Sequence, residues 1–584
     1  MNSPTLKTLY TRWGKTLCRE NPLPEYPRPQ LQRESWQSLN GVWSYAVRSK
    51  EIAMPRVADG EIVVPFSPEC VLSGAAKAPT SEETLWYWCE FYAKTDCDKR
   101  LLLHFGAVDQ CCTVYLNGKE IGAHAGGYLP FSIEILDTSI QNGINKLCVA
   151  VRDEGDGPLY AYGKQRKNRG GIWYTPQSGI WQSVWLESVP REYIQNVKLT
   201  PLYDEGKIHF TIQADFKAAP LFTVKIFDGE KCVATEETKH TSFAIAIEKY
   251  KSWSPDSPFL YTAEITAGAD KVCTYFGMRK FSTGPDARGK MRLLLNNKPI
   301  FHTGLLDQGY WSDGLYTPPS DEAIIWELSQ IKAMGFNMLR KHIKIEPLRW
   351  YYHCDRLGIM VWQDFVSGGA PYSSLVTQVL PFLGKTLNDC YYKRFGRENA
   401  EGRAIFERDM QDTVNTLYNT VSLAVWVPFN EGWGQFDSAR ITEALRRLDA
   451  TRSIDAASGW HDQGAGDFCS KHIYYKKYRL QADKQGRVQA LTEFGGYSCP
   501  CEAHMSSDKL FGYRMFQNGN ALTKAFVQLY ETEVIPALKD GLSAAIYTQV
   551  SDVEDEINGI FTYDREVQKL NAAAVRRINK QLTL

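Results

Sequence analysis

The feature that most constrains the fold is a change of hydrophobic pattern near residue 284 of the 584-residue chain. Before this point, apolar residues occur in short alternating runs separated by turn residues, as in antiparallel β-sheets. After it, apolar runs of strand length alternate with amphipathic stretches of helix length. The chain is also too long for one hydrophobic core, since cores stop growing beyond about 250–300 residues. The sequence therefore predicts β-rich domains followed by a separate α/β domain.

Residues 1–190 form the first predicted domain. Strand candidates such as Leu101–Gly106 and Thr113–Leu116 are short and bounded by turns. The pair Asn117-Gly118 lies between two such runs, which is a strong signal for a β-hairpin. No segment here carries a long helical period, so we expect an all-β jelly-roll sandwich.

Residues 191–283 form a second β-rich unit of about 90 residues. Short alternating strands of this number and length are typical of an immunoglobulin-like sandwich. The segment Gly284–Gly289, which contains two glycines and a proline, is interpreted as a linker to the next domain.

Residues 284–584 are predicted to form a (β/α)8 barrel. The strand candidates are mostly apolar and separated by helical stretches. They are Pro299–Leu306, Phe336–Arg340, Ile359–Asp364, Leu423–Asn430, Ser453–Trp460, Cys469–Tyr475, Val488–Glu493 and Leu542–Val550. A doubly wound open sheet is the alternative, but no glycine-rich phosphate loop follows any of these strands. The barrel is therefore favoured.

Two glutamates mark the carboxyl ends of predicted strands four and seven, where the active site of such a barrel lies. Strand four leads into Asn430-Glu431, and strand seven ends at Glu493. Taken singly, each glutamate is better explained as a surface residue or a helix cap than as a catalytic group. Together on one barrel rim, two carboxylates are the catalytic equipment of a glycosidase.

Several motifs along the whole chain resemble glycoside hydrolase family 2. The family's two carboxylate motifs are matched by Asn430-Glu431 and by Thr492-Glu493-Phe494-Gly495. Motifs of its jelly-roll and immunoglobulin-like domains are matched by Tyr26–Gln30, Leu39–Trp43, Gly126–Phe131, Ser178–Glu187 and Trp253–Tyr261. The resemblance follows the family's domain order and covers nearly the entire chain.

The resemblance implies a retaining exo-β-glycosidase that removes terminal sugars from small glycosides. Glu493 would be the nucleophile and Glu431 the acid/base, while Asn430 would bind the sugar 2-hydroxyl. A β-galactosidase-like specificity is favoured, with β-mannosidase and β-glucuronidase types as alternatives. A carbohydrate-binding protein without catalysis is the less favoured class, because both glutamates are kept within full motifs.

Further candidates for substrate binding lie at other predicted strand ends. Arg340 ends strand two, where it resembles an arginine of the family that pairs with the nucleophile, and His342 follows two residues later. Asp364 ends strand three and is interpreted either as a sugar ligand or as a helix cap. Trp460 is expected either to stack on a sugar or to pack in the core.

Predicted strand six contributes His472 and Tyr474, and its pattern resembles one in which a tyrosine hydroxyl orients the nucleophile. The adjacent Tyr475 leaves the register open. The segment Asp153–Gly171 has a basic middle, and we expect it to close one side of the barrel mouth. A solvated surface loop is nearly as good an interpretation of this segment.

The composition limits the kinds of partner that we expect the protein to bind. The 67 basic and 67 acidic residues cancel, so bulk attraction to nucleic acid or to an anionic membrane is not expected. The chain has no apolar run of about 18 residues and no signal peptide. Its 14 cysteines are scattered without metal-site spacing, which favours free thiols in the cytoplasm. We expect a small carbohydrate substrate and no metal or cofactor; assembly into a homo-oligomer stays open.

Overall fold

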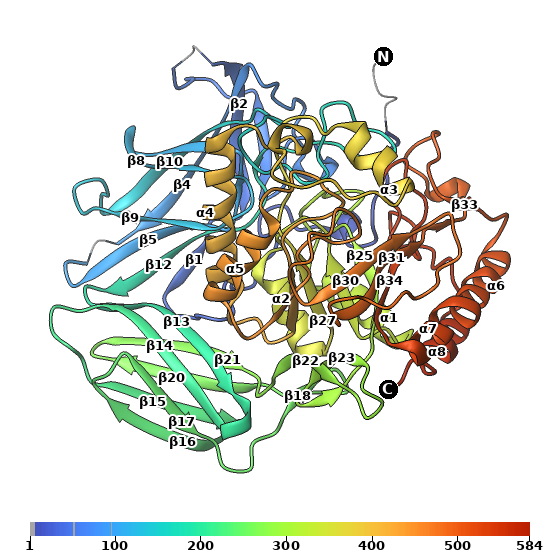
Figure 1. Cartoon of the computed structure of the whole chain (residues 1–584). Helices are drawn as coiled ribbons and strands as arrows, with labels where there is room; N and C mark the ends of the chain where they lie inside the picture. The colour runs from blue at the N-terminus through green and yellow to red at the C-terminus, as the bar shows by residue number, and fades with distance from the viewer. Residues whose placement is uncertain (1–5, 51–52, 95) are drawn as a thin grey trace.

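The computed structural model describes residues 6–50, 53–94 and 96–584 and begins with a β-sandwich (Figure 1, blue to cyan). One sheet has the order β1 (Trp36–Ser38), β12 (Val184–Pro190), β5 (Lys99–Phe105), β9 (Phe131–Ile135). The other has the order β3 (Gly60–Val64), β2 (Gly41–Ser49), β4 (Glu83–Ala93), β10 (Gly143–Arg152), β7 (Cys111–Leu116), β8 (Lys119–Ala125). A small pair, β6 (Val108–Asp109) and β11 (Gly179–Ile180), lies beside them.

The sandwich follows from the alternation in its sequence. Along β7 the side chains alternate between half-buried and buried, and the buried ones, such as Val114, join a core with Leu103 and Val149. The predicted hairpin forms between β7 and β8, because Asn117 and Gly118 adopt the left-handed backbone that a tight turn requires, with φ of 52° and 82°.

The second unit is a smaller sandwich (Figure 1, green). Its three-stranded sheet has the order β13 (Tyr193–Leu202), β14 (Lys207–Asp215), β17 (Ser242–Ala246). Its four-stranded sheet has the order β16 (Lys231–Thr238), β15 (Phe222–Asp228), β20 (Tyr261–Ala267), β21 (Asp270–Phe276). The pair β18 (Trp253–Ser254) and β19 (Ser257–Pro258) follows β17 in the chain.

The prediction of a linker at Gly284–Gly289 is wrong. Gly284 is part of β22 (Phe281–Pro285), which pairs with β23 (Met291–Leu295), and β24 (Lys298–Pro299) completes a small sheet. The turn between β22 and β23 is tight because the Asp286 carboxylate accepts the backbone N–H groups of Arg288 and Lys290.

The third unit is a nearly closed barrel of parallel strands, which confirms the predicted fold class. The order is β29 (Ser453–Ile454), β28 (Leu423–Val427), β27 (Met360–Asp364), β26 (Met338–Lys341), β25 (His302–Asp307), β34 (Leu542–Thr548), β31 (Val488–Gly495), β30 (Phe468–Ile473). Strand five, β29, is far shorter than predicted, and the ladder is open between β29 and β30.

Helices cover the outside of most of the barrel (Figure 1). They are α1 (Asp321–Ala333), α2 (Leu348–Leu357), α4 (Ala400–Leu417), α5 (Ser438–Leu448), α6 (Gly519–Leu529), α7 (Ile535–Asp540) and α8 (Ala572–Asn579), with a short α3 (Leu380–Phe382) in the insertion after β27. Ser320 caps α1, accepting the N–H of Ala323. In the described chain no helix separates β29 from β30 or β30 from β31, which corrects the expectation of a helix after every strand.

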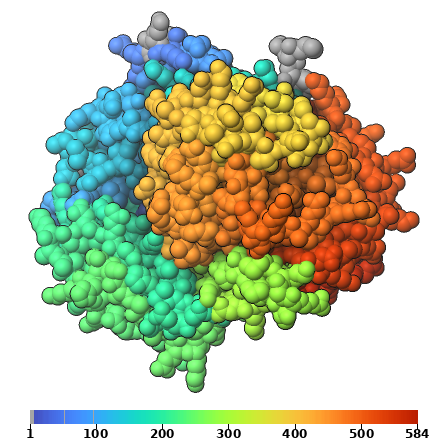
Figure 2. Space-filling model, in the orientation of Figure 1, coloured from blue at the N-terminus to red at the C-terminus, as the bar shows by residue number. Residues whose placement is uncertain are grey.

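The three units pack closely together in the space-filling view (Figure 2). Trp253 of the second unit donates its indole N–H to the carbonyl of Asp355 in α2, at 2.7 Å. Among the described residues, no helix has the length and apolar character needed to cross a membrane. All fourteen cysteines lie in this described part and are free thiols.

Candidate active site

Glu431 is placed by a backbone connection at the end of β28. Asn430 forms a bridge with Ser458, and the N–H of Glu431 donates to the Ser458 carbonyl at 3.0 Å. Glu431 itself has φ of 51°, a left-handed conformation that is unfavourable for a residue with a side chain. Such strain is typical of functional positions, where surrounding contacts hold a side chain in one direction.

Glu493 lies within β31 at an irregular point of the sheet. The register of β31 shifts against β34 between Leu491 and Phe494, and against β30 it pairs Glu493 with His472. Bulges of this kind re-aim side chains and occur next to active sites. The irregularity therefore brings Glu493 beside the neighbouring strand's histidine.

The two glutamates and His472 converge. Their nearest ligand atoms all lie within 4.8 Å of one another, and all three residues are buried. His472 Nδ1 lies 2.8 Å from Glu431 Oε1 and 3.5 Å from Glu493 Oε2. One oxygen of each carboxylate thus lies within 4.8 Å of the other, which is nearer to the separation of about 5–5.5 Å in retaining glycosidases than to the roughly 6.5–9.5 Å in inverting ones.

Arg340 organises the site from β26. Its side chain is fully buried and donates to Asp364 Oδ1 at 2.9 Å, Glu493 Oε1 at 3.2 Å and Asn430 Oδ1 at 2.7 Å. The last contact fixes the amide of Asn430, so that its Nδ2 becomes a buried donor with no hydrogen-bond partner among the described residues. A buried donor without an acceptor is costly, and a substrate hydroxyl would supply the acceptor.

Asp364 supports neighbouring side chains. Its second oxygen lies 2.7 Å from His342 Nδ1, and the residue is 0% exposed. The structure thus places Asp364 in contact with both Arg340 and His342. His342 itself packs edge-on against Trp433, with ring centroids 6.0 Å apart.

Strand β30 and its extension settle the tyrosine register. Tyr474 donates its hydroxyl to Glu493 Oε2 at 2.6 Å and stacks on Tyr513 at 3.8 Å, whereas Tyr475 is exposed. Trp460 is half-buried, 6.2 Å from the His472 ring, at the edge of the same group.

His472 is a buried histidine between the two glutamates. Burial lowers its pKa to about 4, which favours the neutral imidazole. Its Nε2 lies 3.3 Å from Arg340 Nη1 and 3.2 Å from Ser458 Oγ, and Ser458 Oγ donates its own hydrogen to Thr492 Oγ1. Together with the two glutamates, His472 has the spacing of a metal site.

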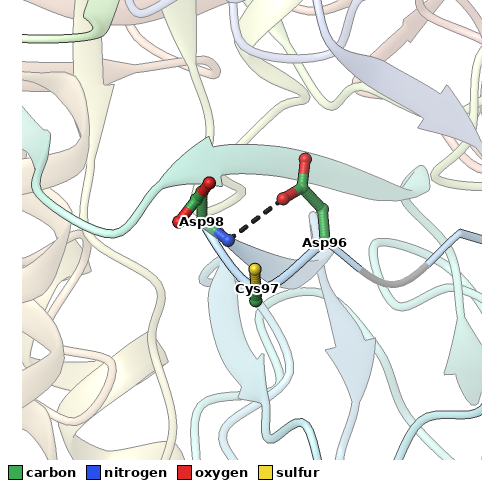
Figure 3. A group of neighbouring side chains, drawn as sticks. All are labelled: Asp96, Cys97 and Asp98. Atoms are coloured by element: carbon green, nitrogen blue, oxygen red, sulfur yellow. Dashed lines mark hydrogen bonds between the residues drawn. The ribbon is translucent and has the colours of Figure 1, made fainter.

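A second group with metal-site spacing, Asp96, Cys97 and Asp98, lies in the exposed turn between β4 and β5 (Figure 3). Asp96 Oδ1 accepts the backbone N–H of Asp98 at 3.0 Å, which is a turn contact. This group is distant in sequence from the barrel and contributes nothing to the paired glutamates.

Burial raises the pKa of both glutamates above that of an ordinary carboxyl group. Burial raises the pKa of Glu431 to about 7, against the opposing effects of Lys164 and Arg340. Burial also raises the pKa of Glu493, opposed by His472, Arg340 and the Tyr474 hydrogen bond. Glu493 thus has hydrogen-bond donors on both oxygens, which favour its charged form.

Sequence reasoning missed part of the wall around this group. Glu556, Trp433 and Tyr513 all lie close to the paired glutamates. Lys164, within the basic loop noted in the sequence, is buried beside Trp433. Only Trp433 carried a local signal, since it follows Glu431 by two residues; the others are brought in by tertiary packing.

Comparison with known proteins identifies the class. Residues 36–190 match the model "Glycosyl hydrolases family 2, sugar binding domain", residues 192–279 match "Glycosyl hydrolases family 2", and residues 288–579 match "Glycosyl hydrolases family 2, TIM barrel domain". The chain therefore belongs to glycosyl hydrolases family 2, as the sequence motifs indicated.

The individual relatives are distant. The chain is 25% identical over 420 residues to a mannosylglycoprotein endo-beta-mannosidase of Lilium longiflorum, covering 62% of this chain and 41% of that one. It is 22% identical over 433 residues to a beta-glucuronidase of Streptococcus agalactiae, covering 70% and 68%. The matches span less than half the length of the first curated relatives.

A solved structure of a beta-glucuronidase from an uncultured Clostridium sp. superposes with a TM-score of 0.74 at 19% identity, covering 94% of this chain and 99% of that one. At this identity the similarity establishes a shared fold. It leaves the sugar specificity to be argued from the site itself.

Proposed function

We propose that the protein is a retaining exo-β-glycosidase in which Glu493 is the nucleophile and Glu431 the acid/base. The observation that carries this proposal is the close approach of two buried carboxylates at the barrel mouth, within 4.8 Å. Family membership supports it, because the chain keeps both glutamates within the motifs that identified the family.

The first step forms a glycosyl-enzyme. A Glu493 oxygen attacks the anomeric carbon, the bond from that carbon to the leaving oxygen breaks, and Glu431 gives its proton to this oxygen. A pKa of about 7 keeps Glu431 largely protonated in mildly acidic solution, as the acid role requires.

The second step releases the sugar. Glu431, now a carboxylate, takes a proton from water, the water oxygen bonds to the anomeric carbon, and the bond to Glu493 breaks. Two inversions leave the β-configuration unchanged. Asn430 Nδ2, the buried donor without a partner, is placed to bind the 2-hydroxyl throughout.

We propose an uncharged terminal sugar, with β-galactosides as the first candidates. Relatives named β-galactosidase, β-glucuronidase and β-mannosidase stand at similarly low identity, so their names do not choose among these sugars. The free thiols favour a cytoplasmic enzyme.

The test is a panel of 4-nitrophenyl β-glycosides followed by proton NMR of the first product formed. The proposal predicts release of the β-anomer before mutarotation. An α-anomer as first product would show inversion and would remove Glu493 from the nucleophile role.

A further inference from the structure

A loop of the N-terminal sandwich is fixed to the barrel mouth. The backbone N–H groups of Tyr162 and Gly163 both donate to the carbonyl of Ser367, each at 3.0 Å, just beyond β27. The Tyr162 hydroxyl donates to the Gly369 carbonyl at 3.0 Å. Further along, the Tyr174 hydroxyl donates to Glu556, after β34. The residues between these anchors therefore hold a defined position against the barrel.

The loop delivers a lysine into the site. Lys164 is 5% exposed, and its ammonium lies 4.7 Å from the ring centroid of Trp433 and 5.5 Å from that of Trp173. Within the described residues this ammonium has no hydrogen-bond acceptor and no ion-pair partner. Arg340, the other cation of the site, donates to several acceptors.

The faces of Trp433 and Trp173 stabilise the ammonium by cation–π contact and leave its hydrogens free for an acceptor. Burial lowers the pKa of Lys164, and the charges of Glu556, Glu493 and Glu431 oppose this effect, Glu556 most strongly. The ammonium also lies 5.9 Å from the ring centroid of Tyr174, whose hydroxyl donates to Glu556, so the charge of Lys164 lies near this carboxylate.

Glu556 follows β34 in the chain. It is 2% exposed, and its two oxygens accept from Asn558 Nδ2 and from the Tyr174 hydroxyl. The Lys164 ammonium and the Glu556 carboxylate are electrostatic neighbours but form no ion pair within 4.0 Å. The gap between a donor and an acceptor suits a hydroxyl group, which both accepts and donates.

We propose that Lys164 and Glu556 bind hydroxyl groups of an uncharged terminal sugar, so that a loop of the sandwich contributes a specificity-determining residue to the barrel site. The inference rests on the proposed glycosidase function and adds the residues that recognise the sugar. It assigns the jelly-roll loop a direct contact with substrate.

The charges in the site favour an uncharged sugar over a uronic acid. Arg340 is already paired with Asp364 and Glu493. Lys164 lies near Glu556. The cations Arg340 and Lys164 are therefore outnumbered by the carboxylates of Asp364, Glu493 and Glu556, even while Glu431 keeps its proton. A sugar carboxylate would add a further negative charge next to these groups and would be repelled.

The experiment compares K164M with K167M, an exposed lysine of the same loop, on neutral 4-nitrophenyl β-glycosides and on the corresponding β-glucuronide and β-galacturonide. We expect K164M to lower kcat/KM on the preferred neutral substrate by about 10- to 100-fold, the range for a lost hydrogen bond to a charged group. K167M should match the wild type.

Substrates lacking one hydroxyl at a time identify the contact. The wild type should lose a similar factor for one particular deoxy sugar, and K164M should lose nothing further on that sugar. K164M should also unfold at the same or a higher temperature than the wild type, because it removes a buried charge without breaking a bond. A lysine with a purely structural role would instead lower that temperature.

Two results would overturn the inference. One is equal kcat/KM for K164M and K167M; the other is a wild-type preference for uronides that K164M abolishes. If the wild type hydrolyses no β-glycoside, the proposed function fails, and the inference is tested by calorimetry with methyl β-galactoside, β-glucoside and β-mannoside. Binding lost in K164M alone would support it, and equal or absent binding in the wild type and both variants would contradict it.

Discussion

At the scale of single residues, Arg340 connects the nucleophile to its surroundings. Its fully buried guanidinium pairs with Asp364 and Glu493 and fixes Asn430. In Arg340→Met these carboxylates would be left buried without their cation, which costs about 3–5 kcal/mol. We expect the free energy of unfolding, measured by urea denaturation at neutral pH, to fall by that amount.

The same substitution should change catalysis. Without Arg340, the pKa of Glu493 rises further, so the acidic limb of the pH profile of kcat/KM should move to higher pH. An unchanged acidic limb would show that Arg340 does not influence the ionisation of Glu493. A change to Lys, which keeps the charge, should shift the limb less.

The ionisation of Glu431 predicts the other side of the profile. Burial raises its pKa to about 7, so the proton needed by the leaving group is present below this pH and is lost above it. We expect kcat/KM to decline as the pH rises through about 7. Glu431→Ala assayed with a dinitrophenyl glycoside, which needs no protonation, should lose this decline; a decline that persists would assign it to another group.

The sequence could identify those candidate residues that lie at the ends of apolar strand runs. Glu431 and Glu493 follow apolar strand runs, and Arg340 ends another, so strand ends alone selected them. The choice between Tyr474 and Tyr475 depended on which side of β30 faces the barrel mouth. That register follows from a sheet irregularity between Lys471 and His472, which a single sequence does not reveal.

At the scale of elements, the loop from the sandwich depends on Gly163. Its φ is 60°, and a Cβ there would lie 2.8 Å from the carbonyl oxygen of Ile343 in the barrel. Gly163→Ala should therefore displace the loop as well as strain the backbone. We expect kcat/KM to fall on the order of 10-fold, because small misplacements of binding groups are expensive in catalysis.

Gly118 provides the matched control. It also has a left-handed φ, of 82°, but its Cβ would meet nothing within 4 Å. Gly118→Ala should cost about 1–2 kcal/mol of stability from backbone strain alone and leave kcat/KM unchanged. Equal activity in the two variants would show that the loop position does not matter for catalysis.

Elements differ in how well sequence predicts them. The turn at Asn117-Gly118 is local, so it was predicted and is confirmed. The strand β29 was predicted as eight residues but has two; between it and β30 the chain pairs again at Ser458, through an isolated bridge with Asn430. Tertiary contacts overrode the apolar pattern there.

At the scale of the whole molecule, the site is built by two units together. The barrel supplies Glu431 and Glu493, while the N-terminal sandwich supplies Lys164 from a loop anchored beyond β27. Figure 1 shows the sandwich alongside the barrel, with α4 standing between them. The sequence predicted both units and the basic loop. The burial of Lys164 follows from the packing of the sandwich against the barrel, which a single sequence does not reveal.

The central claim is that Glu493 bonds to the sugar and Glu431 handles the proton. The most direct measurement is the configuration of the glycosyl azide formed when sodium azide restores activity to Glu493→Ala. Azide would then occupy the space of the missing carboxylate and attack from the α-face. The account predicts an α-glycosyl azide from Glu493→Ala and a β-glycosyl azide from Glu431→Ala; the reverse assignment would contradict it.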